Sequence, residues 1–199
     1  MKLLFLLSYF VLIVNLQYSS CLMTTQKLKI ALSEEHLSFI SFIETLDDDK
    51  FTLSKEEKWS AGQQLEHIHL SIKPLLQVFS TPKIILKTVF GKGSGASRTY
   101  DEVVESYHKV LEEGGKATAK YVPKTMPLKN RSYTVEGLKN VIEKLIDKLN
   151  NSNDQELDEI LVPHPLLGKM TIREMLYFTL YHVRHHHQVA TQNLNAWSH

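Results

Sequence analysis

The chain has 199 residues, enough for one domain with a sizeable core. Hydrophobic residues make up 43% of the sequence and charged residues 23%, a balance that excludes a disordered chain or one built from membrane spans. The formal net charge of +1 gives no electrostatic basis for nucleic acid as a partner. Glycine is scarce and helix-forming residues dominate, so we expect an all-α fold.

Residues 1–22 differ from the rest of the chain. A basic start is followed by an apolar run from Leu3 to Leu16 and a short end of small and polar residues. This pattern is typical of a secretory signal peptide, and the run is too short for a comfortable transmembrane helix. If the signal is real, we expect export to a periplasmic or lipid-anchored location; otherwise we expect a cytoplasmic protein.

Two alternatives compete with the signal peptide. Cys21 resembles the site of a bacterial lipoprotein signal, although Tyr18 departs from that motif, and Met23 could be the true start. In each case we expect residues 23–199 to form the folded domain. Cys21 is the only cysteine, so neither an intrachain disulfide nor a cysteine zinc site can form. Any metal must therefore be held by nitrogen and oxygen ligands.

The remaining chain shows helical spacing of apolar residues and no convincing strand. Ser60, Thr99 and Thr171 each begin a capping box, which marks a helix start. Pro74 lies inside one pattern and is expected to kink or restart that helix. The glycine-rich stretch 91–97 lacks a preceding strand and a Walker motif, so we interpret it as a connector. Helices are predicted at 24–46, 60–79, 82–90, 99–120, 134–150 and 171–195, with a crossing loop at 121–133. These elements predict a four-helix bundle with one long crossover connection.

The last predicted helix carries four histidines within residues 182–187. His182 and His186 are spaced i, i+4, so their side chains lie on one face, roughly 5–6 Å apart at Cβ. That face also carries the apolar stripe of the helix, so both imidazoles should point into the bundle. Buried imidazoles need a partner, which a metal or hydrogen bonds can supply. His185 is expected at the border of the stripe and His187 in solvent.

A third ligand has two candidates on the second predicted helix, His67 and His69. They lie about 200° apart around the helix, so only one can face the site. The apolar stripe that includes Leu65 and Ile68 favours His69. Two other metal motifs fail: Glu105-x-x-His108 occurs once where a di-iron bundle needs two copies, and Val183 stands where a zincin needs its glutamate.

Two motifs resemble those of the DinB-like superfamily, which includes the bacillithiol transferases. They are Trp59-Ser-Ala-Gly-Gln-Gln-Leu-Glu-His67-Ile, and His164-Pro-Leu-Leu-Gly168-Lys-Met-Thr171-Ile-Arg-Glu-Met followed by Tyr181-His182-Val-Arg-His-His186. The resemblance covers residues 24–195 and implies a four-helix bundle with a divalent metal bound by three histidines. By position these are His67, His182 and His186, with His69 as the fallback for the first.

Three histidine ligands leave at least one coordination position open, as in catalytic sites. The ligand set does not separate Zn, Ni, Mn and Fe. The resemblance implies a hydrolase or a thiol-dependent S-transferase, acting on a small-molecule substrate with a low-molecular-weight thiol as partner. No carboxylate stands out as a general base, which favours thiol transfer, whereas a genuine signal peptide would count against it. The alternative is a non-catalytic metal-stabilised bundle or ligand-binding protein, and a homodimer is compatible with a bundle of this size.

Overall fold

The structure is a computed structural model that describes residues 22–55 and 57–197. The predicted export signal therefore lies outside the described residues, except for Leu22. Within the described ranges, no helix is long and apolar enough to cross a membrane.

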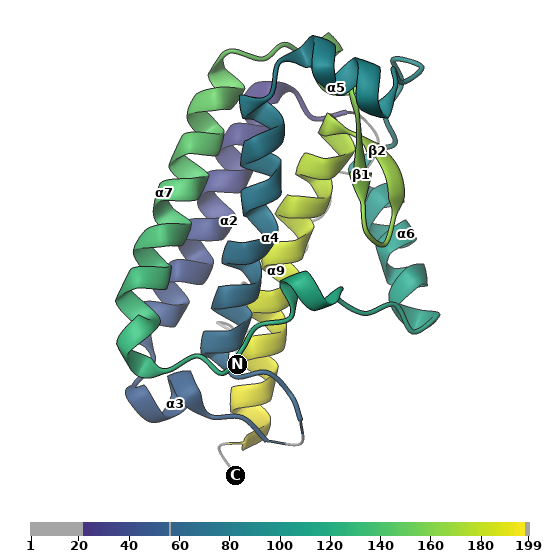
Figure 1. Cartoon of the computed structure of the whole chain (residues 1–199). Coiled ribbons are helices and arrows are strands. Elements are labelled where there is room, and N and C mark those ends of the chain that lie inside the picture. Colours follow the sequence, from purple (N-terminus) through teal and green to yellow (C-terminus); the bar gives the residue numbers. More distant parts are fainter. Residues whose placement is uncertain (1–21, 56, 198–199) are drawn as a thin grey trace, which may run out of the picture.

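Four long helices form a bundle (Figure 1). They are α2 (Thr25–Thr45), α4 (Ala61–Ser80), α7 (Arg131–Asn150) and α9 (Ile172–Trp197). Helices α2 and α4 each contact both α7 and α9. The bundle core is apolar, with Leu28 and Leu32 of α2, Leu65 of α4 and Leu145 of α7 fully buried. The predicted all-α, four-helix architecture is confirmed.

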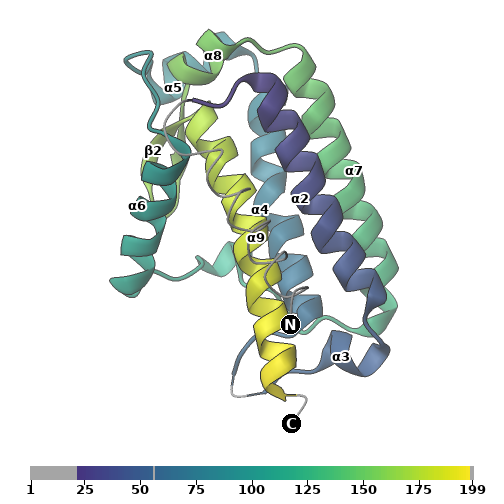
Figure 2. The same cartoon turned by 180° about the vertical axis from the view of Figure 1, so that it is seen from behind.

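The chain directions explain the long crossover. Helices α4 and α7 are neighbours that run the same way, as do α2 and α9 (Figure 1). The segment between α4 and α7 must therefore return along the whole bundle. It contains α5 (Lys83–Phe90), α6 (Tyr100–Glu112), η1 (Ala119–Tyr121) and η2 (Leu128–Asn130). On its way α6 packs against α9 and η1 packs against α4. Figure 2 shows α6 standing outside the bundle beside α9.

Most helix starts follow the predicted capping chemistry. Ser60 and Thr99 each form a reciprocal capping box with the residue three positions on. Thr171 does the same with Glu174, whose backbone N–H donates to Thr171 Oγ1 while its carboxylate accepts from the Thr171 N–H. The expected restart at Pro74 is wrong, because α4 continues through it. A proline inside a helix removes one backbone hydrogen bond, and the packing of α4 against α7 and α9 tolerates that loss.

The helix predicted at 99–120 is shorter than expected. Helix α6 ends at Glu112 instead of near residue 120, because Gly114 adopts a left-handed conformation with φ of 88°. Helix α7 begins at Arg131, three residues before the predicted start.

The expectation of no strand is also wrong. Strands β1 (Leu161–His164) and β2 (Gly168–Thr171) form an antiparallel hairpin that pairs Val162 with Met170. Both of these side chains are buried, so the hairpin is held by packing against the helices as well as by its own ladder. Four-residue strands, one of them containing a proline, are too short for alternation to reveal them. Two short helices, α3 (Asp48–Thr52) and α8 (Asp154–Glu159), were not predicted.

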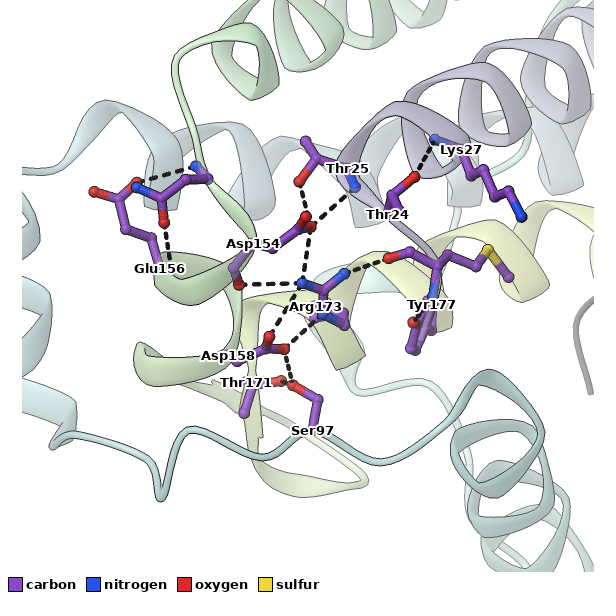
Figure 3. Close-up of polar contacts among 12 residues, drawn as sticks. Thr24, Thr25, Lys27, Ser97, Asp154, Glu156, Asp158, Thr171, Arg173 and Tyr177 are labelled. Atoms are coloured by element: carbon purple, nitrogen blue, oxygen red, sulfur yellow. Dashed lines mark hydrogen bonds and ion pairs between the residues drawn. The ribbon is translucent and has the colours of Figure 1, made fainter. Parts of the chain in front are cut away.

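A buried arginine fastens the start of α9 to its neighbours (Figure 3). Arg173 is 1% exposed, and its guanidinium donates to Asp158 (Nε–Oδ1, 2.5 Å) and to Asp154 (Nη2–Oδ1, 3.0 Å). It also donates to the carbonyl of Met23, whose N–H in turn donates to Tyr177 Oη at 2.8 Å. These bonds join α8 and Met23, which lies two residues before α2, to one turn of α9. The register of α9, and with it the height of its histidines, is thereby fixed in the bundle.

Candidate metal centre

Helices α4 and α9 run in opposite directions and bring three histidines from distant parts of the chain together. The Nε2 atom of His182 lies 3.1 Å from that of His67 and 3.0 Å from that of His186. One ring nitrogen from each residue lies within 4.8 Å of the others. The three side chains are buried, with exposed fractions of 4%, 6% and 8% for His67, His182 and His186. The three residues that the resemblance selected thus form one cluster that can hold a metal ion.

The other ring nitrogen of two ligand candidates is already engaged. His67 Nδ1 is 2.7 Å from the carbonyl oxygen of Tyr121, and His186 Nδ1 contacts the side-chain oxygen of Gln64. Both oxygens can only accept, so each Nδ1 carries the hydrogen and each Nε2 presents a lone pair. Partners of this kind fix the ring orientation of metal-bound histidines.

The convergence of these nitrogens fits a cation. His182 Nε2 carries at most one hydrogen, so it can donate to His67 or to His186, but not to both. At least two lone pairs therefore face each other at close range in a buried place. A divalent cation between the three nitrogens would turn this repulsion into coordination by three neutral imidazoles.

The electrostatics of the cluster keep the imidazoles neutral. Burial lowers the pKa of all three histidines, and that of His182 and His186 lies well below the usual histidine value. The neighbouring imidazoles of the cluster lower the pKa of His182 and His186 further, because a second positive charge nearby would be repelled. The neutral form, which is the form that binds metal, is thus the resting state at neutral pH.

His69, the candidate favoured by periodicity, lies elsewhere. It is buried between α4 and α7, where a Cβ built on Gly137 would come within 2.7 Å of its Cε1 atom. Burial lowers its pKa to about 4. Helix α4 is covered on two sides, by α7 and by α9, so its apolar stripe does not identify the side that faces the cluster.

The other two histidines of the run behave differently from each other. His185 is half-buried beside the cluster, as expected, with its ring 5.1 Å from that of His186. His187 was expected in solvent, and this is wrong. Its ring lies 4.7 Å from that of Phe42 and 5.6 Å from that of Phe39. Helix α2 covers this side of α9. His187 is therefore packed, although it lies outside the apolar stripe of α9.

A cavity of about 580 Å³ adjoins the cluster, and all three histidines line it. Its wall comes from α4, α6, α9, the β hairpin and the crossing segment around η1. Most of the wall is apolar, including Leu75, Val78, Leu111, Met175 and Phe178. Among the described residues that line it there is no carboxylate, and Lys120 is the only lysine or arginine.

Sequence reasoning missed several residues that shape the centre. Trp59 was noted only as part of a motif, yet its ring lies 5.0 Å from that of His67 and stacks at 15° on His186. Gln64 lies one turn before His67, and this spacing could have identified it as a residue that contacts the histidine cluster. The Tyr121 contact uses a backbone carbonyl, so no side-chain pattern could have revealed it.

Comparison with known proteins agrees with this geometry. The sequence profile of the DinB superfamily matches residues 31–190, which include all of α4 and the part of α9 that carries the histidines. No curated protein matches the chain. The match spans most of the sequence, and the helical bundle with its three-histidine cluster is consistent with it. This chain belongs to the DinB superfamily.

Proposed function

We propose that the protein is a divalent-metal enzyme that transfers an electrophilic group to a low-molecular-weight thiol. The observation that carries this proposal is the convergence of the Nε2 atoms of His67, His182 and His186 at the wall of a largely apolar cavity. Three imidazoles alone do not select among Zn, Ni, Mn and Fe. When bound, such a metal supplies Lewis acidity, which lowers the pKa of a thiol or water and polarises a carbonyl.

The composition of the cavity wall favours thiol transfer over hydrolysis. Hydrolysis at a metal centre commonly uses a carboxylate as general base, and the described lining residues contain none. A thiol is acidic enough to lose its proton to solvent without such a base. Lys120 lies exposed at the cavity wall and offers a charge for a carboxylate, a group that small cellular thiols commonly carry.

The chain's own residues would hold and shield the reactants. Trp59 and Phe178 border the cluster with aromatic surface, and Leu75 and Val78 extend the apolar wall. In the transfer, the thiol loses its proton to solvent and its sulfur forms a C–S bond with the electrophile. With an aryl chloride, chloride departs with the bonding electrons; with an aldehyde or another oxygen electrophile, the electron pair moves onto the oxygen, which takes up a proton. The apolar wall favours an electrophile with a hydrocarbon body over a charged one.

Metal analysis of the purified full-length chain tests the site. We expect about one divalent metal per chain in the wild type and in His185→Ala, a matched control in the same histidine run. His67→Ala and His182→Ala should each lose most of it, because two imidazoles hold a divalent ion far less tightly than three. A wild type without stoichiometric metal at neutral pH would refute the site.

A second experiment tests the activity. Cysteine and glutathione serve as thiols, with an aryl chloride and an aldehyde as electrophiles, and product is followed with and without a chelator. Turnover that the chelator abolishes and metal restores supports the proposal. A chain that carries metal but shows no turnover, and that unfolds more readily when the metal is removed, is a non-catalytic metal-stabilised bundle.

A further inference from the structure

Besides the three cluster histidines and His185, one more histidine, His164, lies in the cavity wall. It ends strand β1, is 9% exposed and lines the same cavity as the three cluster histidines. Its ring lies 4.3 Å from that of Phe178, which stacks on His182 at 4.8 Å. One aromatic ring thus separates His164 from a ligand candidate.

The turn of the hairpin fixes which nitrogen of His164 carries the hydrogen. The backbone N–H groups of Leu166 and Leu167 both donate to His164 Nδ1, at 3.2 Å and 3.0 Å. Nδ1 is therefore an acceptor, and in the neutral ring the hydrogen must be on Nε2. Protonating Nδ1 would set it against two N–H donors. Burial acts in the same direction and lowers the pKa of His164 to about 4.

The Nε2–H group has no partner within the described protein. The hydrogen bonds that the His164 ring makes to the described residues all use Nδ1. Within residues 22–55 and 57–197, the only fully buried polar side-chain atom without a partner is Nε2 of His36. His164 Nε2 is therefore accessible in part, and His164 lines the cavity, so this nitrogen can donate to a molecule bound there. A fixed donor at an apolar wall is worth more to a ligand than one in water, because little else competes for it.

We propose that His164 is a substrate-binding residue whose Nε2–H donates a hydrogen bond to an oxygen of the electrophile. The ligand class is an apolar molecule with one uncharged acceptor oxygen, such as a ketone, ester or epoxide. The substrate role of His164 rests on the proposed function. It adds a second polar contact, besides Lys120, to a mostly apolar cavity. Such a contact fixes the orientation of a ligand that apolar packing alone leaves free to turn.

A pair of probes of the same shape tests the inference. Acetophenone and α-methylstyrene differ in a carbonyl oxygen against a methylene group. We expect wild-type protein, as purified, to bind the ketone about 2- to 10-fold more tightly, the range for one net hydrogen bond. In His164→Asn the side-chain oxygen can still accept from the turn, but no N–H reaches the position of Nε2, so the preference should fall toward that of an apolar wall. His164→Gln keeps an N–H near the Nε2 position and should retain the preference, as should the control His108→Asn.

A second measurement needs no variant. Nitrogen-15 NMR of the wild-type imidazoles should show the His164 hydrogen on Nε2 at neutral pH, and its signal should shift more with the ketone than with the hydrocarbon. A hydrogen on Nδ1 would overturn the inference, as would equal ketone preference in wild type and His164→Asn. Metal content is measured in both proteins, so failure of the metal site is seen separately. Loss of metal in His164→Asn would show that this residue supports His182 instead, and would also overturn the inference.

Discussion

Acid should destabilise this protein through a buried histidine that is not one of the proposed ligands. His36 of α2 is 1% exposed, its Nδ1 donates to the Leu32 carbonyl at 2.8 Å, and its Nε2 has no partner among the described residues. Burial lowers its pKa from 6.5 to about 4, and the Leu32 contact and Glu35 oppose this only in part. The folded state therefore holds this ring neutral where the unfolded chain would protonate it.

The sign and size follow from proton linkage. A folded-state pKa below the unfolded value means that stability is greatest above about pH 6.5 and is lost as pH falls toward about 4. Each pKa unit is worth about 1.4 kcal/mol, so His36 alone should cost about 2 kcal/mol at pH 5 and about 3 kcal/mol below pH 4. Leucine is similar in size and cannot titrate, so His36→Leu should remove the part of the acid-induced loss of stability that His36 causes.

Urea unfolding of wild type and His36→Leu at pH 7, 6 and 5, with a chelator present, measures this share. The leucine variant should lose about 2 kcal/mol less than wild type between pH 7 and pH 5. A packing change from the substitution shifts all three values together and does not alter this difference. Equal losses in the two proteins would refute the assignment of a buried, neutral His36.

Two other predictions concern the neighbours of the histidines. Gln64→Ala removes the acceptor for His186 Nδ1 and should weaken metal binding about 10- to 100-fold in chelator competition. Gln64→Glu keeps an acceptor and should bind metal with an affinity closer to that of wild type. Equal metal affinity in Gln64→Ala and wild type would show that the contact does not orient the ring. Gly137→Ala places a methyl group 2.7 Å from His69 Cε1, and the overpacking cost of about 1–3 kcal/mol should exceed the helix-propensity gain of about 1 kcal/mol. In a His69→Ala background the same change should instead stabilise the protein in urea unfolding, and a loss of stability there would contradict the contact.

The bundle could be predicted from sequence because its signals are local. Capping boxes at Ser60, Thr99 and Thr171 mark helix starts, and the long apolar stripes require burial against other helices. The i, i+4 pair His182 and His186 was likewise readable, because helix geometry alone places both on one face.

The remaining features depend on contacts between distant segments. Choosing His67 over His69 required knowing which side of α4 meets α9, and periodicity gave the wrong answer because α7 covers the other side. The burial of His187 depends on α2, and the orientation of His67 depends on a backbone carbonyl more than fifty residues away. The hairpin that carries His164 was too short to show a period of its own.

The parallel arrangement of α4 and α7 affects how substitutions can change the ligand that this centre accepts. Because these neighbours point the same way, the chain between them must travel back along the bundle, and on that route it supplies the Tyr121 carbonyl and one wall of the cavity (Figure 1). Two of the four bundle helices carry the imidazoles, whereas one part of the cavity wall belongs to the returning segment. Substitutions or changes of length there can alter which molecules fit while the three histidines keep their places. The residues that can hold a metal and part of the wall that selects a ligand thus lie on different segments, so the second can vary while the first stay unchanged.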